Sequence, residues 1–199
     1  MTVLLIVSIL LLVIYISLFF YYRSAWNDIP AFKPSTLNLK PSTYISVIIP
    51  ARNESENLLS LLESLSAQTY PAALFEVLII DDHSTDDTAA IAKSFASKNI
   101  KLVSLKEFIA GDEINSYKKK AIEIGIQQSS GSLIVTTDAD CYLPPNWLQT
   151  IAAFYEQYHS AFIAAPVSIN CGMSFIEIFQ TLDFMTLQGI TGEIGRAHV

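Results

Sequence analysis

Apolar and polar residues alternate along this chain in blocks of two kinds. Short β-branched or aromatic runs, typical of buried strands, are followed by longer segments in which apolar residues recur every three or four positions, as on the core-facing side of a helix. Leu58, Leu61, Leu62 and Leu65 show the helical spacing most clearly. This alternation predicts βαβ units, and therefore an α/β fold in which helices flank a mostly parallel sheet.

The blocks predict the elements in chain order. We expect strands at residues 45–50, 75–80, 100–105, 133–137 and 162–165. The first helix is expected to begin at Asn53, with Glu56 completing a capping box. Later helices are expected from Ser84 or Thr85 to about residue 97, over 118–129, from Pro144-Pro145 to 158, and over 175–187, with a loop at 108–117.

The first 22 residues carry no charged side chain, and residues 3–22 are almost wholly apolar. About 20 such residues suffice to cross a bilayer as a helix. A cleavable signal peptide is the alternative, but no basic segment precedes the run and no small-residue cleavage site follows it. We therefore expect an uncleaved transmembrane anchor at residues 1–23 and a linker at residues 24–43. Because Arg23, Lys33 and Lys40 follow the span, the remainder should lie in the cytoplasm, at the inner membrane.

The composition argues against several other classes of protein. The net charge is −7, whereas a nucleic-acid-binding domain usually presents a basic face. Two cysteines, Cys141 and Cys171, make neither a disulfide framework nor a zinc site, and we expect reduced, buried thiols. Neither GxGxxG nor GxxxxGK[ST] occurs, which argues against NAD enzymes and P-loop NTPases.

Two of the predicted strands end in pairs of carboxylates. Asp81 and Asp82 follow strand 75–80, and Asp138 and Asp140 follow strand 133–137. Ligands of such sheets bind beyond the carboxyl ends of the strands, so one crevice can hold both pairs. Together they suit a nucleotide whose base and ribose need hydrogen-bond acceptors and whose phosphates arrive with a divalent cation. Taken alone, the pair Asp138 and Asp140 could equally be an acidic surface turn.

Three stretches together resemble the family 2 glycosyltransferases of GT-A fold, over about residues 45–167. They are ISVIIPARNESENLLSLLESLSAQTYP, FEVLIIDDHSTDDT and KKKAIEIGIQQSSGSLIVTTDAD. The resemblance implies a GT-A (Rossmann-like) domain that binds a nucleotide-sugar donor of UDP type together with Mn²⁺ or Mg²⁺. It also implies inverting transfer of the sugar to a lipid or saccharide acceptor hydroxyl. Many bacterial members are membrane-tethered, which agrees with the expected anchor.

The resemblance also implies roles for seven residues. Six are expected to bind the donor: Pro50, Arg52, Glu54, Asp82, Lys118 and Asp138. In the family, the loop that contains the first three surrounds the base and ribose, and the aspartate at position 82 accepts a hydrogen bond from the uracil ring. The lysine at position 118 lies near the pyrophosphate, and the first aspartate of the D-x-D pair faces the ribose. The second aspartate of that pair, Asp140, is expected to bind the metal ion.

Plainer interpretations remain for several of these positions. Arg52 can equally be structural, and Lys118–Lys120 can be merely the solvated start of a helix. Asp86 and Asp87 are interpreted as helix-start charges rather than ligands. His83 stands where the family more often has a small or amide residue, and we interpret it as a solvated loop residue.

Two family motifs, an acidic general base in an [ED]-D context and a Q-x-x-R-W-like sequence, are not found in this chain. The catalytic base is therefore left unassigned. Residues 193–199, EIGRAHV, match a translated sequencing adapter and are expected to be a non-native tail. We therefore expect residues 44–192 to be the incomplete, nucleotide-sugar-binding part of a longer enzyme, and inactive on their own.

Two other functions are alternatives to the transferase. A membrane-tethered nucleotide-binding or scaffold protein would retain the donor residues without turnover. A nucleotidyltransferase would require a glycine-rich first loop bearing Arg or Lys, and the loop ARNESEN has no glycine.

Residues 175–187 resemble the amphipathic helix that lies along the membrane face in membrane-bound family members.

Overall fold

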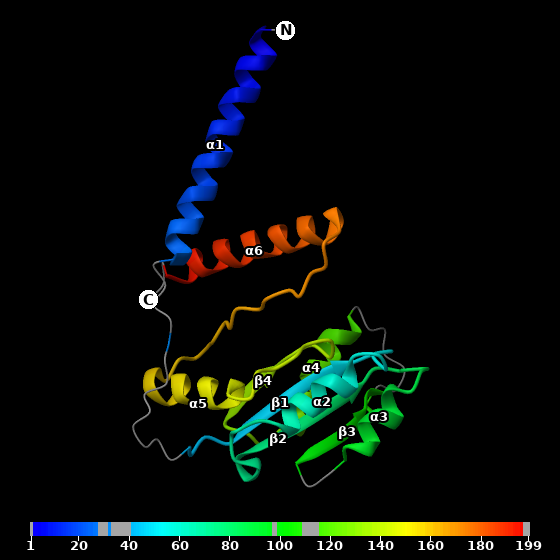
Figure 1. Cartoon of the computed structure of the whole chain (residues 1–199). Helices are drawn as coiled ribbons and strands as arrows, with labels where there is room; N and C mark the ends of the chain where they lie inside the picture. Colours follow the sequence, from blue (N-terminus) through cyan, green and yellow to red (C-terminus); the bar gives the residue numbers. More distant parts are fainter. Residues whose placement is uncertain (1, 28–31, 33–40, 97–98, 109–115, 197–199) are drawn as a thin grey trace. The chain divides into compact units, whose positions relative to one another are not determined.

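The computed structural model describes residues 2–27, 32, 41–96, 99–108 and 116–196 (Figure 1). The chain divides into two compact units. One comprises Met1–Phe32 and Phe162–Val199, and the other comprises Lys33–Ala161. The second unit contains the predicted sheet.

The sheet of the second unit has four parallel strands, which confirms the predicted α/β class. They are β1 (Ile45–Ala51), β2 (Phe75–Asp81), β3 (Ile100–Ser104) and β4 (Leu133–Thr136). Their order is β3-β2-β1-β4. The chain moves outward from β1 to β3 and then returns to the other side of β1, so the strand order reverses between β1 and β4. Sheets of this kind bind ligands beside such a switch point.

Helices cover both faces of the sheet. They are α2 (Leu58–Ser66), α3 (Thr88–Ser94), α4 (Tyr117–Gln128) and α5 (Trp147–Tyr158), with short 3₁₀ helices η1 (Ala72–Leu74) and η2 (Leu105–Glu107). Val47 and Ile49 point to the face where they pack with residues of α2, α3 and α5. Ile48, between them, points to the other face and packs with residues of α4. Apart from Ser46, every residue of β1 is apolar, because both faces of this strand are buried.

Helix α4 lies very close to β1. A Cβ atom built on Gly125 would come within 2.4 Å of Ile48 Cγ2, so the helix can approach this far only because residue 125 has no side chain. Ala121 and Ile124 are buried in the same interface. The helix begins at Tyr117, and this packing sets the position of that first turn.

A buried carboxylate links the strands at the end of the sheet where they begin. Glu76 is 1% exposed and accepts hydrogen bonds from Ser46 Oγ (2.8 Å), from Ser130 N (2.7 Å) and from Ser130 Oγ (2.6 Å). Lys101 Nζ lies 3.0 Å from its other oxygen. Burial by itself raises the pKa of Glu76, but the hydrogen bonds from Ser130, Ser46 and Lys101 outweigh it and lower the pKa to about 2. One side chain thereby joins β1, β2, β3 and the turn that precedes β4.

The predicted start of the first helix was wrong. Helix α2 begins at Leu58, and its N-cap residue is Asn57 rather than Asn53. Asn53 instead has φ 55°, in the left-handed region, and its side-chain oxygen accepts a hydrogen bond from Thr85 N at 2.9 Å. The capping-box pattern was present, but a neighbouring loop provided a competing partner for Asn53.

The predicted fifth strand was also wrong. Residues 162–165 form no strand, and the side chain of Phe162 is 84% exposed. A short apolar run becomes a strand only where another strand meets its backbone hydrogen bonds, and sequence pattern does not indicate that partner. Within the described residues the sheet ends at β4.

The first unit contains two long helices, α1 (Thr2–Asn27) and α6 (Phe175–Arg196). The segment Thr2–Ser24 contains an 18-residue window with a mean hydropathy of 3.1 and is long and apolar enough to span a membrane. Because α1 continues to Asn27, the first residues of the expected linker are helical, and most of the rest lies outside the described residues.

Cys171 is exposed and Cys141 is half-buried, so the expectation of two buried thiols was wrong.

Candidate functional site

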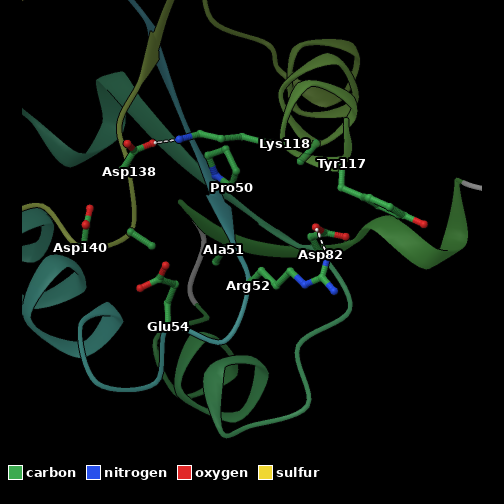
Figure 2. Close-up of a pocket in the computed structure, with 11 residues that line it drawn as sticks. Pro50, Ala51, Arg52, Glu54, Asp82, Tyr117, Lys118, Asp138 and Asp140 are labelled. Carbon is green, nitrogen blue, oxygen red and sulfur yellow. Dashed lines mark hydrogen bonds and ion pairs between the residues drawn. The ribbon is translucent and has the colours of Figure 1, made fainter. Parts of the chain in front are cut away.

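A cavity of about 400 Å³ lies at the carboxyl ends of β1, β2 and β4 (Figure 2). All seven residues that the family resemblance indicated contribute to its lining: Pro50, Arg52, Glu54, Asp82, Lys118, Asp138 and Asp140. They come from the end of β1 and the β1–α2 connection, the end of β2, the first turn of α4 and the loop after β4. Four separate segments of the chain therefore meet at one place, as the strand ends of a parallel sheet allow.

The two loops at the floor of this cavity are joined by hydrogen bonds. Asn53 N donates to Ser84 Oγ (3.1 Å), and Glu54 N donates to the buried Thr88 Oγ1 (2.8 Å). Asp86 accepts from Ser55 N at 3.1 Å and from Thr88 N at 3.0 Å. These hydrogen bonds, first from Thr88 and then from Ser55, hold the pKa of Asp86 well below its ordinary value. Asp86 thus joins the loops in addition to standing just before helix α3.

Asp82 is the most enclosed carboxylate among the seven residues. Its side chain is 8% exposed, and each of its oxygens has a neighbour. Arg52 Nη1 donates to Oδ2 at 3.5 Å, and His83 Nδ1 lies 3.0 Å from Oδ1. Asp82 is also held through its backbone, because its N–H donates to Ala51 O at 2.8 Å. This acceptor is therefore fixed in place at the end of β2.

His83 lies in a loop, as expected, but its side chain also contacts two residues that line the cavity. Its side chain is 35% exposed, and its ring meets the Tyr117 ring edge-on, with centroids 5.8 Å apart. The backbone of His83 has φ 58°, a conformation that few residues other than glycine adopt. This conformation accompanies the contacts of its ring with both Asp82 and Tyr117. The Arg52 guanidinium also lies over the Tyr117 ring, 5.8 Å from the centroid.

Lys118 and Asp138 form an ion pair near the other end of the cavity. Lys118 Nζ lies 2.7 Å from Asp138 Oδ1, and Figure 2 shows the two side chains pointing toward each other. Both side chains are more than half exposed, and ion pairs in that environment typically contribute about 0–1 kcal/mol. The pair can therefore open at little cost when a more highly charged group enters the cavity.

The acidic residues of the cavity fit a divalent cation that a ligand brings with it. The described residues contain no group of three or more His, Cys, Asp or Glu side chains able to hold a metal ion by themselves. Asp138 and Asp140 do present two carboxylates to one cavity. Mg²⁺ is typically held by one or two carboxylates together with substrate phosphates, rather than by a cage made of protein alone. Such a donor set suits a cation shared with a diphosphate.

Four lining residues are not among those expected from the sequence: Ala51, Tyr117, Ala121 and Ala139. Tyr117 has the largest side chain of the four. It was assigned to the end of a loop, but it is the first residue of α4, and it contributes to the cavity wall. Its place directly before Lys118 was the available signal in the sequence. An aromatic residue at a loop–helix junction is too common a pattern to indicate a binding site.

Comparison with known proteins agrees with this architecture. Residues 46–192 match the model of the family described as glycosyl transferase family 2. Glycosyltransferase AglE of Haloferax volcanii is 38% identical over 106 residues, which cover 53% of this chain and 33% of the relative. Poly(ribitol-phosphate) beta-N-acetylglucosaminyltransferase TarS of Staphylococcus aureus is 33% identical over 116 residues, covering 58% of this chain and 19% of the relative. The matched region thus spans at most about a third of these relatives.

Solved structures show the same fold. The crystal structure of S. aureus TarS 1–349 has a TM-score of 0.52 at 28% identity, over 63% of this chain and 39% of that one. TarS 1–349 has also been solved in complex with UDP-GlcNAc, with a TM-score of 0.50 at 29% identity, over 63% of this chain and 37% of that one. The mannosyltransferase PcManGT of Pyrobaculum calidifontis, in complex with GDP-Man and Mn²⁺, has a TM-score of 0.53 over 82% of this chain and 45% of that one, at 23% identity.

The family match covers most of the chain and includes every described strand of the sheet apart from Ile45, together with every segment that lines the cavity. The chain belongs to glycosyl transferase family 2, and its sheet domain has the GT-A fold.

Proposed function

We propose that the cavity binds a nucleoside diphosphate sugar of UDP type, and that the protein transfers the sugar with inversion to an acceptor hydroxyl at the cytoplasmic face of the membrane. The observation that carries this proposal is the meeting of Asp82, Lys118, Asp138 and Asp140 in one cavity. They provide an enclosed hydrogen-bond acceptor at one end and a cation beside two carboxylates at the other. A nucleoside diphosphate has the complementary order of groups, with a base at one end and a metal-binding diphosphate at the other.

The ionic part of the cavity suits the leaving group. As the bond between the anomeric carbon and the phosphate oxygen breaks, negative charge develops on the diphosphate. Lys118, released from its exposed pair with Asp138, can move its ammonium group to that charge. Asp140 would hold Mn²⁺ or Mg²⁺, which would neutralise the developing charge as a Lewis acid when bound, and Asp138 would face the ribose. Stabilisation of charge that develops in the transition state is often the largest part of catalysis.

The acceptor hydroxyl would attack the anomeric carbon from the side opposite the diphosphate, and its proton would pass to a general base. We assign no residue of this chain as that base. Two TarS structures, with UDP and with UDP-GlcNAc, support a uridine donor by similarity. The donor sugar and the acceptor, whether a lipid or a saccharide, belong to the activity of the whole enzyme.

The membrane side of the proposal rests on the first unit. Helix α1 is long and apolar enough to span a bilayer, and Arg23, Lys33 and Lys40 follow it in the sequence. Basic residues beside a span are retained in the cytoplasm. Helix α6 exposes large apolar side chains, among them Phe175, Ile176, Phe179 and Leu182. Such a surface would suit contact with the membrane interface, near a lipid-linked acceptor.

The test is a calorimetric titration of the full chain, in detergent micelles, with UDP in the presence and absence of Mn²⁺. We expect binding that depends on the metal ion and that the substitution Asp140→Ala abolishes, because it removes the proposed metal ligand. The fold should stay largely intact, because residue 140 lies in the loop beyond β4 rather than in the core. The matched control is Asp87→Ala, which removes an exposed aspartate that does not line the cavity. Equal affinity for UDP with and without Mn²⁺ would contradict the metal assignment, and no binding of UDP by the folded wild type would contradict the donor assignment.

A further inference from the structure

Tyr117 is the largest exposed aromatic surface beside the enclosed acceptor of the cavity. The residue is 42% exposed, whereas the Asp82 side chain is 8% exposed. Both contribute to the lining of the same cavity. The position of the Tyr117 ring is restricted, because the His83 ring meets it edge-on with centroids 5.8 Å apart. An exposed aromatic ring held beside a hydrogen-bond acceptor is a surface on which a planar heterocycle can bind.

Arg52 already makes the contacts that such a heterocycle would make. Its guanidinium group lies over the Tyr117 ring, 5.8 Å from the centroid, and its Nη1 donates to Asp82 Oδ2 at 3.5 Å. A guanidinium is planar and carries its N–H donors in that plane. A uracil base has the same two properties, since it presents a flat π face and a single ring N–H in its plane. In the ligand-free protein, Arg52 therefore occupies the contacts that suit a nucleobase.

We propose that the nucleobase of the donor stacks on Tyr117 and takes from Arg52 both the tyrosine ring and the Asp82 oxygen. This inference rests on the proposed function, because it concerns the base of the same nucleoside diphosphate. It adds Tyr117 to the donor-binding residues. Tyr117 would fix the plane of the base, and Asp82 would accept the hydrogen bond from the ring N–H at the edge of the base.

The contacts of Arg52 are easily exchanged for those of a base. Its side chain is 57% exposed, and its hydrogen bond to Asp82 is long, at 3.5 Å. His83 stays on the other carboxylate oxygen, Oδ1, at 3.0 Å, so Asp82 keeps its orientation when Arg52 leaves Oδ2. Base–aromatic stacking is strong enough to matter, because truncation of the aromatic side chain typically weakens binding about tenfold.

The experiment compares UDP with 5,6-dihydrouridine 5′-diphosphate, which keeps the ring N–H and both carbonyls but has lost the aromatic plane of the base. Both ligands are titrated calorimetrically into the full chain in micelles with Mn²⁺. We expect the wild type to bind the dihydro ligand about tenfold more weakly than UDP. Tyr117→Phe, which keeps the ring, should preserve that ratio. Tyr117→Leu, which keeps an apolar side chain but no ring, should bind UDP about tenfold more weakly and no longer distinguish the two ligands.

The control is Tyr158→Leu, which removes an exposed tyrosine at the end of α5, outside the cavity lining. It should behave as the wild type. If Tyr117→Leu weakened both ligands by the same factor, Tyr117 would only support Arg52 and His83, and the inference would be overturned. A wild type that binds UDP and the dihydro ligand equally would overturn it without any variant. A folded wild type that does not bind UDP would instead contradict the proposed function.

Discussion

At the scale of single residues, the carboxylates of this domain are held in two different ways. Those that line the cavity have exposed or exchangeable partners, as the Lys118–Asp138 pair shows. Glu76, at the other end of the sheet, is 1% exposed and accepts three hydrogen bonds besides its contact with Lys101. A buried group that loses a partner destabilises a fold, because its remaining charge or hydrogen-bonding capacity is left uncompensated.

We predict that Glu76→Gln destabilises the sheet domain by about 2–3 kcal/mol at pH 7, because the new amide group turns a donor toward Ser46, Ser130 or Lys101, which are themselves donors. The pKa of Glu76 is lowered from 4.5 to about 2 in the folded protein. The stability that its charge provides is therefore fully present above about pH 4.5 and is lost as the pH falls toward 2.

The measurement is urea unfolding of the wild type and the variant at a series of pH values between 7 and 2, with Glu63→Gln, an exposed position in α2, as the control. The stability difference between wild type and Glu76→Gln should narrow below about pH 4.5. A stability difference that stays constant over this pH range would show that the substitution does not act through the charge of Glu76.

Most residues of the cavity were accessible from the sequence, and the exceptions have a physical reason. Asp82, Asp138 and Asp140 follow apolar runs that are recognisable as strands, so their meeting at one edge of the sheet was predictable. The contact between Tyr117 and His83 joins the first turn of α4 to the loop after β2, where His83 has φ 58°. Neither a positive φ at histidine nor a contact between distant segments leaves a periodic pattern in the sequence.

At the scale of elements, the position of α4 depends on one close contact. Gly125 allows the helix to lie against Ile48 of β1, and the first turn of the same helix carries both Tyr117 and Lys118. A change at residue 125 should therefore be felt at the cavity, although that residue lies more than two helical turns along the chain from Tyr117.

We predict that Gly125→Ala destabilises the domain by about 1–3 kcal/mol, because the added methyl group would lie 2.4 Å from Ile48 Cγ2 and must displace the helix or the strand. It should also weaken UDP binding, since Tyr117 and Lys118 move with the helix. Urea unfolding and calorimetry measure the two effects, with Gln128→Ala, an exposed position in the same helix, as the control. Unchanged stability and unchanged affinity would show that α4 adjusts to the methyl group locally.

The same comparison of elements shows which of them the sequence could predict. The four strands and the helices that cover them were predicted to within a few residues at most ends, because their apolar residues are buried on defined faces. The N-cap residue of α3 is Asp87 rather than Ser84 or Thr85, so the predicted start of that helix was wrong. The start of α2 and the supposed strand at 162–165 were also predicted wrongly. Both depended on partners elsewhere in the chain, Thr85 for Asn53 and a neighbouring strand for residues 162–165, and local pattern contains no such information.

At the scale of the whole molecule, the chain combines a sheet domain with a unit whose first helix is almost wholly apolar. Among the residues of α1 whose burial is described, none is buried, and its large apolar side chains from Val3 to Tyr21 are exposed. Water is an unfavourable solvent for that surface, and a bilayer is the natural one.

We predict that the full chain remains in the membrane fraction after an alkaline carbonate wash. Replacing Leu11 and Leu12, near the middle of α1, by lysine should release most of it, because each lysine at the centre of a span costs about 2.5–3.5 kcal/mol on insertion scales. Replacing the same two residues by isoleucine is the matched control and should change nothing. Retention of the lysine variant after the wash would show that α1 is not the anchor.

The strand order β3-β2-β1-β4 also has a consequence for the handling of the protein. At one margin of the sheet, β3 carries Lys101, and a charged side chain at such a margin discourages the addition of further strands. At the other margin, β4 consists of Leu133, Ile134, Val135 and Thr136, none of them charged, and pairs within the described residues only with β1. Two copies that meet along β4 could continue each other's sheet, so self-association should increase with protein concentration, and ligand affinities should be compared at several dilutions.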